Sequence, residues 1–141
     1  MLRFLSKLQP WAITLVRIAL GMTMLYHGWD KVIPKGSPLH GKLLAALDHF
    51  AAYVVTLGLP HWLGYVSALT EFLGGILLLT GLLVRLAALM VAGNMLVALV
   101  KVNVHHGYSG SEYTIALITM ALLLVTTGAG ALSLDRRFGI T

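Results

Sequence analysis

The sequence contains no cysteine among its 141 residues. A disulfide framework and a cysteine-ligated zinc site are therefore excluded. Thiol–disulfide exchange by this chain is excluded as well, because that chemistry requires an attacking thiolate.

Charged residues are also scarce, at 11% of the chain, whereas soluble domains average about 25%. Hydrophobic residues make up 58%, and the mean hydropathy is +0.87. This composition lacks the polar surface that a water-facing domain needs, so we expect an integral membrane protein. The length suits a single domain.

The formal net charge is +5, but the basic residues form no stripe interleaved with aromatic side chains. We therefore expect no nucleic-acid binding. Most of the basic residues lie outside the apolar segments, where they fit anchoring beside the anionic lipid head groups of a bilayer. These residues are Arg3, Lys7, Lys35, Lys42, Arg136 and Arg137.

Four apolar segments approach the roughly 20 residues that cross a bilayer as a helix. They cover about residues 10–29, 61–83, 84–104 and 113–131. Helices are required because lipid cannot hydrogen-bond to exposed backbone groups. Arg17 interrupts the first segment and no small-residue cleavage site follows it, which favours a retained span over a signal peptide. We expect an all-α protein with a four-transmembrane-helix bundle.

The connection between the first two segments is long and contains a further helical pattern at about residues 42–57. Its apolar side chains recur at helical spacing, and polar side chains mark another face. We expect an amphipathic helix that lies on the membrane or caps the bundle. The apolar positions are Leu43, Leu47, Phe50, Val54 and Leu57.

Four spans place both termini on one side of the membrane. The positive-inside rule favours the side with more basic residues as the cytoplasmic one. The terminal side would hold Arg3, Lys7, Arg85, Arg136 and Arg137, and the other side Lys31, Lys35, Lys42 and Lys101. We therefore expect cytoplasmic termini, by five basic residues to four.

Each span gathers small or polar residues on one helix face, and ordinary helix packing explains most of them. Helix packing does not explain charged residues within the spans. A charge at the centre of a span costs about 2.5–3.5 kcal/mol on insertion scales and is normally paired or functional. Antiparallel threading leaves the Cα atoms of Arg17 and Glu71 at different depths, and the long arginine side chain would narrow the gap. We hypothesise an intramembrane Arg17–Glu71 ion pair, either structural or lining a functional path.

Threading also gathers histidine, lysine and glutamate residues at the rim where the first and third spans end and the fourth begins. This rim could hold an anionic or quinone-like head group, relay protons, or form a solvated belt. Together with the central carboxylate, the candidates for ligand binding or proton relay are His27, Lys31, Glu71, His105 and Glu112. We expect no metal site, because no HExxH pattern is present.

Several short motifs follow one another in a fixed order. They are Arg17-Ile-Ala-Leu-Gly21, His27-Gly28-x-x-Lys31, Glu71-x-x-Gly74-Gly75, Gly81-x-x-x-Arg85, and the ending Gly128-Ala-Gly130-Ala-Leu-Ser133-Leu-Asp135. In this order and spacing, the chain resembles the DoxX family of small membrane proteins over nearly its whole length. Two features depart from the family pattern, namely a polar insert at about residues 35–49 and a last span without a basic residue.

The resemblance implies a four-span protein of the bacterial inner membrane, associated with respiratory or redox machinery. Some relatives act as membrane subunits of a thiosulfate:quinone oxidoreductase. It therefore implies a quinone as the ligand, a redox partner protein, and no covalently bound cofactor. The positions that match the family's polar motifs are Arg17, His27, Lys31, Glu71, Arg85 and Glu112.

Three functions stay open at this point. The first is a redox subunit that binds a quinone or positions a partner enzyme, with His27 and Glu71 as hydrogen-bonding groups. The second is a small-molecule or proton-coupled transporter, which four spans would support best as a homo-oligomer. The third is a non-catalytic membrane scaffold. For Asp135 in the last motif, we expect a structural cap on backbone amides or an ion pair with Arg85 or Arg136.

Overall fold

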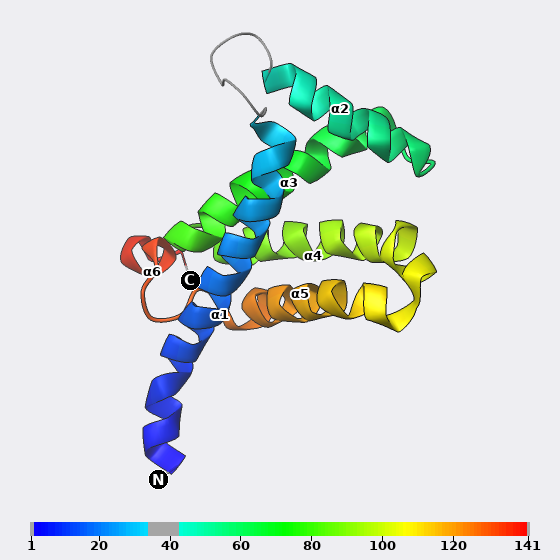
Figure 1. Ribbon diagram of the computed structural model, residues 1–141. Helices are drawn as coiled ribbons and strands as arrows, with labels where there is room; N and C mark the ends of the chain where they lie inside the picture. Colours follow the sequence, from blue (N-terminus) through cyan, green and yellow to red (C-terminus); the bar gives the residue numbers. More distant parts are fainter. Residues whose placement is uncertain (1, 34–42, 141) are drawn as a thin grey trace.

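The computed structural model describes residues 2–33 and 43–140. Within them the chain forms α1 (Leu2–Val32), α2 (Leu43–Thr56), α3 (His61–Thr80), α4 (Val84–Lys101), the 3-10 helix η1 (Asn103–His106), α5 (Gly107–Thr127) and α6 (Leu134–Phe138) (Figure 1). Four of the described helices, α1, α3, α4 and α5, are long and apolar enough to cross a membrane. The all-α, four-span architecture expected from the sequence is confirmed.

Two helices differ in extent from the sequence expectation. α1 begins at Leu2 and continues through Pro10, so its 31 residues extend about 46 Å at 1.5 Å per residue. This exceeds the roughly 30 Å of bilayer hydrocarbon, and the first turns of α1 project beyond the other helices in Figure 1. α5 begins at Gly107 and ends at Thr127, where Gly128 adopts a φ of +82°.

α1 and α3 form the closest helix pair, and they run antiparallel. Gly28 faces Phe72, and Gly75 faces Leu25. A Cβ at Gly28 would lie 2.5 Å from the backbone nitrogen of Phe72, and a Cβ at Gly75 would lie 2.5 Å from that of Leu25. Small residues therefore let the two backbones touch, as expected for membrane helices.

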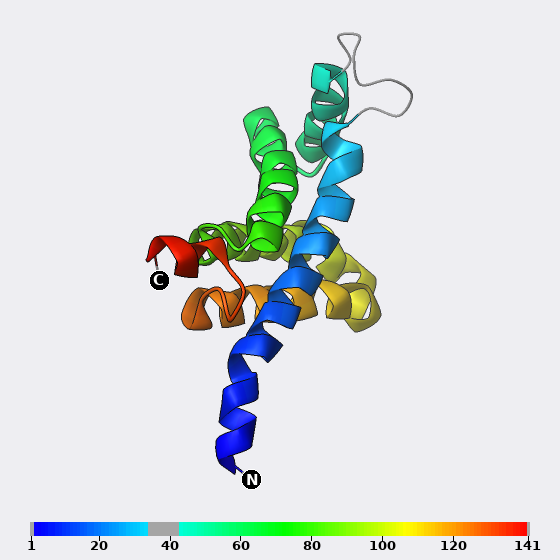
Figure 2. The same ribbon diagram turned by 90° about the vertical axis from the view of Figure 1, so that its left-hand side faces the viewer.

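α4 and α5 form a second antiparallel pair, and α1 crosses this pair steeply in both views (Figures 1 and 2). The core lies where the two pairs meet. Its fully buried larger side chains are Leu20, Met24, Leu78, Val84, Val91 and Leu124. The outward faces expose many large apolar side chains, including Leu15, Leu73, Leu89 and Leu122, which suits contact with lipid tails.

The expected amphipathic helix is α2, which packs chiefly on the first half of α3. Gly64 of α3 lies against the backbone of Ala51, and the Tyr65 hydroxyl donates a hydrogen bond to the Asp48 carboxylate. Leu47 is buried together with Val32 and Ala68 in a second, smaller apolar cluster. Lys35 and Lys42, which entered the charge comparison, lie outside the described residues.

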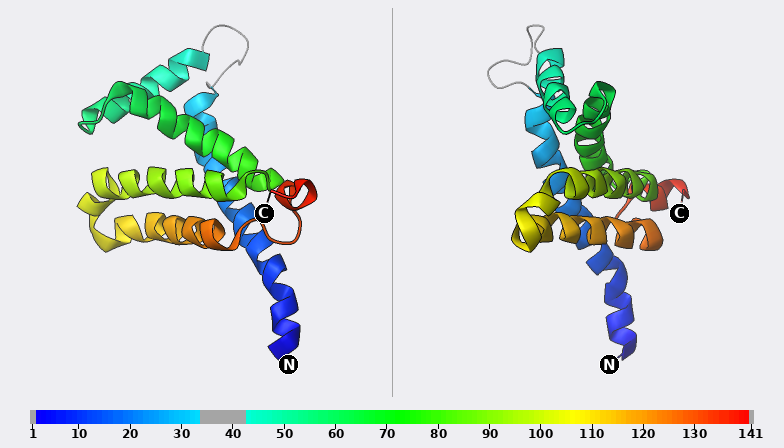
Figure 3. Two further views of the ribbon diagram at one scale, coloured as in Figure 1. Left: turned by 180° about the vertical axis from the view of Figure 1, so that it is seen from behind. Right: turned by 90° about the vertical axis from the view of Figure 1, so that its right-hand side faces the viewer.

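The segment after α5 folds back against the turn between α3 and α4, and α6 lies beside that turn (Figure 3). Asp135 is only 4% exposed, and its carboxylate accepts hydrogen bonds from the backbone N–H groups of Leu83 (2.6 Å) and Val84 (2.8 Å). An acidic group at a helix N-terminus satisfies free amides and complements the helix dipole. The cap expected for Asp135 is confirmed, and its partners are these amides.

Arg17 also holds the segment after α5 in place. Its guanidinium is 2% exposed and donates hydrogen bonds to the backbone carbonyls of Ala129 (3.0 Å) and Leu132 (2.6 Å). The Thr14 hydroxyl adds a bond from the Ala131 N–H at 2.9 Å. The predicted Arg17–Glu71 ion pair is therefore wrong, because the α1–α3 register places Arg17 near the α3–α4 turn, several helical turns away from Glu71.

The first testable consequence concerns the α1–α3 contact. We expect Gly75→Ala to lower the free energy of unfolding by about 1–3 kcal/mol, because the new methyl group meets backbone atoms of α1 that cannot move aside. Gly93→Ala in α4 is the matched control, since a Cβ there meets no atom within 4 Å. Unfolding in mixed detergent measures both variants. Equal stability of the two variants would contradict the close contact.

The second testable consequence concerns the cap that Asp135 forms at the start of α4. We expect Asp135→Ala to lower the free energy of unfolding by about 2 kcal/mol, because two amides at the start of α4 lose a charged acceptor. Glu112→Ala, at an exposed position, should stay within about 0.5 kcal/mol of wild type. The same unfolding titration compares them, and an unchanged Asp135→Ala midpoint would show that the cap contributes nothing.

Candidate ligand-binding site

The polar centre of the molecule is the side chain of Glu71 in the middle of α3. Its side chain is 4% exposed, and one carboxylate oxygen lies 2.5 Å from the Lys31 ammonium. The other oxygen accepts a hydrogen bond of 3.0 Å from the Asn94 carboxamide of α4. A buried carboxylate is costly without such partners, and here a cation and an amide donor both supply them.

The register of α1 on α3 brings Lys31 to this position. Gly28 packs on Phe72, so Lys31, nearly one turn later on α1, reaches the Glu71 carboxylate. The Lys31 ammonium also lies 4.4 Å from the centre of the Phe50 ring of α2, which adds a cation–π contact. Three helices are therefore connected through one ammonium group.

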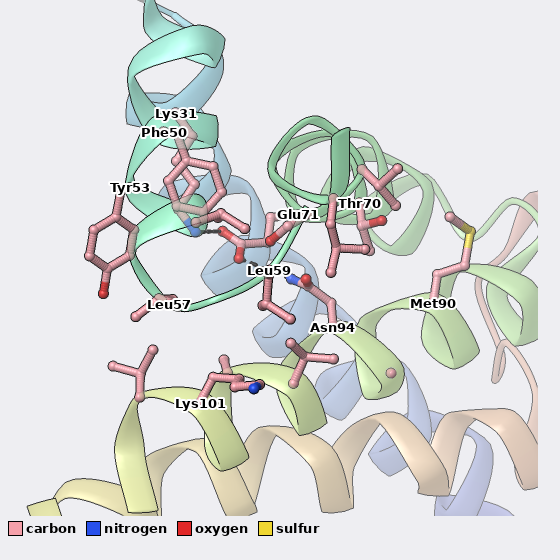
Figure 4. Close-up of a pocket in the computed structure, with 18 of the residues that line it drawn as sticks. Lys31, Phe50, Tyr53, Leu57, Leu59, Thr70, Glu71, Met90, Asn94 and Lys101 are labelled. Carbon is pink, nitrogen blue, oxygen red and sulfur yellow. Dashed lines mark hydrogen bonds and ion pairs between the residues drawn. The ribbon is translucent and has the colours of Figure 1, made fainter. Parts of the chain in front are cut away.

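A pocket of about 370 Å³ opens beside Glu71, between α2, α3 and α4. Figure 4 shows the side chains of Lys31, Glu71 and Asn94 on its inner side and Lys101 on the α4 side. Its walls are mainly apolar, and its size falls in the range of small-molecule sites. The apolar lining includes Phe50, Val54, Leu57, Leu59, Leu63, Val66, Met90, Val97 and Ala98.

The pocket also has polar groups available for a ligand. Thr70 is buried and lines the pocket, and no described residue bonds to its hydroxyl. Ser67 lies one turn earlier on the same helix and also lines the pocket. Hydroxyl, carboxamide and carboxylate groups thus converge on an apolar cavity, which is the usual composition of a site for an amphiphilic ligand.

The structure separates the sequence-predicted candidates into two groups. Lys31 and Glu71 line the pocket. His27, His105 and Glu112 are exposed and do not line it. His27 Nε2 lies 3.4 Å from the Tyr113 hydroxyl. Among the described residues, no cluster of three or more histidine and acidic side chains is arranged to hold a metal ion.

Asn94 was not expected at a binding site, and Lys101 was expected only as one of the lysines of the rim, although both line the pocket. A signal for them exists in the sequence, because they lie seven residues apart and thus on one face of α4. What the sequence does not give is the neighbour of that face. The aromatic wall supplied by Phe50 and Tyr53 was likewise not expected, since it depends on how α2 docks.

The DoxX family model matches residues 12–106, which include most of α1, all of α2 to α4 and the pocket. The chain belongs to the DoxX family. It is 25% identical to the protein named "Putative oxidoreductase CatD" of Bacillus subtilis (strain 168), over 86% of this chain and 82% of that protein. It is 28% identical to "Inner membrane protein YqjF" of Escherichia coli (strain K12), over 94% and 95% of the two chains. No solved structure shows a significant match.

The polar centre of this DoxX-family chain makes a prediction for stability. We expect Lys31→Met to lower the free energy of unfolding by about 3 kcal/mol, because it leaves the buried Glu71 carboxylate without its cation. Adding Glu71→Gln should restore most of that loss, since the amide is neutral. Lys7→Met, at an exposed position on the same helix, is the matched control.

A double-mutant cycle over Lys31 and Glu71, followed by unfolding in mixed detergent, measures the coupling. A coupling energy near zero would contradict the ion pair. Loss of stability in Lys7→Met equal to that in Lys31→Met would show a general effect of removing a charge from α1.

Proposed function

We propose that this DoxX-family protein is an inner-membrane subunit of redox machinery and binds a quinone-like ligand in the pocket between α2, α3 and α4. The observation that carries the proposal is the combination of an apolar cavity of about 370 Å³ with the buried Glu71 carboxylate and its partners Asn94 and Lys31. A quinone needs both features, because its ring and tail are apolar whereas its ring oxygens form hydrogen bonds.

The polar residues of the pocket match the two forms of such a ligand. Quinone carbonyl oxygens accept hydrogen bonds, and the Asn94 carboxamide, the Thr70 hydroxyl and the Lys31 ammonium can donate them. Hydroquinone hydroxyl groups donate, and the Glu71 carboxylate can accept from them. The quinone would supply the electron-transfer chemistry, while the residues of this chain hold and orient its head group.

The names of the two relatives support the redox and inner-membrane parts of the proposal, since one is called an oxidoreductase and the other an inner membrane protein. The chain carries no motif for a bound redox cofactor, so electrons would pass between the quinone and a partner protein. With cytoplasmic termini, as the basic residues favour, the pocket would lie towards the other side, near the ends of α1 and α4.

The proposal predicts saturable stabilisation by a neutral 2-methyl-3-alkyl-1,4-naphthoquinone. A ligand at 100 times its dissociation constant stabilises a folded protein by about 2.7 kcal/mol, which a thermal-shift titration in detergent detects easily. Gly93→Leu should remove the effect without unfolding the protein, because Gly93 lines the pocket and a Cβ there meets no atom within 4 Å. Glu71→Gln should weaken binding of the corresponding hydroquinone, because its hydroxyl groups lose a charged acceptor.

His27→Ala and Glu112→Gln are the matched controls, since both residues are exposed and lie outside the pocket. Both variants should bind like the wild type. Equal loss of binding in His27→Ala and in Gly93→Leu would place the ligand elsewhere. No shift in the wild type would refute quinone binding and favour a membrane scaffold, whose partner would then be sought by co-purification.

A further inference from the structure

Lys101, in the last turn of α4, is a cation that lines the pocket and has no partner among the described residues. It lines the same cavity as Glu71, is exposed, and has no hydrogen bond or ion pair with any described residue. Figure 4 shows it on the α4 side of the pocket, away from Lys31 and Phe50. Lys101 is therefore an exposed cation that lines a mainly apolar cavity.

The charges of the described pocket lining do not balance. Lys31 and Glu71 neutralise one another at 2.5 Å, and Lys101 remains as the extra positive charge. The imidazoles of η1 are exposed and do not line the pocket, so they add no further positive charge to it. A cation beside an apolar cavity attracts an anion more strongly than it would in open water, because screening is weaker there.

We propose that the occupant of this pocket carries an anionic head group, as an acidic quinone or a similar lipophilic acid does, and that Lys101 recognises the charge. This inference rests on the proposed function and narrows its ligand class. A neutral quinone fills the cavity but leaves the Lys101 ammonium without a counter-charge. A ring that carries an ionised hydroxyl fills the same cavity and also forms a charge-assisted hydrogen bond with Lys101.

The test compares two naphthoquinones that share a ring and an alkyl tail. One carries a methyl group at ring position 2 and is neutral, and the other carries an acidic hydroxyl there and is ionised at neutral pH. We expect the hydroxy compound to bind the wild-type protein about tenfold more tightly in the thermal-shift titration, the scale of one hydrogen bond to a charged group.

Lys101→Gln should remove that preference while leaving the affinity for the neutral compound unchanged. Lys7→Gln, which removes a cation outside the pocket, should retain the preference and so controls for a general loss of positive charge. Gly93→Leu should abolish binding of both compounds, which shows that the acidic compound occupies the pocket and not the surface.

The outcomes separate this inference from the proposed function. Equal affinity of the two compounds in the wild type, or an unchanged preference in Lys101→Gln, would overturn the anionic head group while quinone binding stands. If Lys7→Gln lost the preference to the same extent, the preference would come from the general positive charge of the protein and not from Lys101. Failure of both compounds to bind would overturn both proposals.

Discussion

The close contact between α1 and α3 determines which charged side chains meet inside the membrane. Gly28 and Gly75 allow the two backbones to touch, and that contact fixes the register because a shift along the helix axis would push side chains into the backbone of the other helix. In this register Lys31 reaches Glu71, and Arg17 reaches the segment after α5. Both buried charged groups thereby gain hydrogen-bond partners, as a low-dielectric interior requires.

The two ends of the α1–α3 pair then take different roles. At one end, the Arg17 guanidinium and the Asp135 carboxylate both form hydrogen bonds with backbone groups. Arg17 thereby holds the segment after α5 against α1, and Asp135 holds it against the start of α4. That contact also supports Leu83, whose φ of +50° is unfavourable for a residue with a side chain. The hydrogen bonds of these two charged groups to the backbone give them a structural role.

The sequence allowed the four spans, α2 and the Asp135 cap to be predicted, because hydropathy, helical periodicity and capping chemistry act over short distances. It did not allow the partner of Glu71 to be predicted. Several cations lie on polar helix faces, and the choice between Arg17 and Lys31 depends on the register, which Gly28 and Gly75 set through backbone contact. Asn94 and Lys101 share a face in the sequence, but the pocket beside that face depends on how α3 and α4 diverge.

At the other end of the α1–α3 pair, α3 diverges from α4. α3 and α4 meet at the tight turn around Gly81 and lie at an angle to one another (Figure 1), and the pocket lies between them and α2. A tightly packed bundle would fill this space with leucine side chains, but here the chain places Gly93 and Ala98 on α4 and a polar centre at Glu71. Small residues next to a buried polar group favour a space kept for a ligand over a packing defect, because an empty cavity of this size would lower stability. Under the proposal above, the charge of Lys101 then discriminates between neutral and anionic ligands of the same shape.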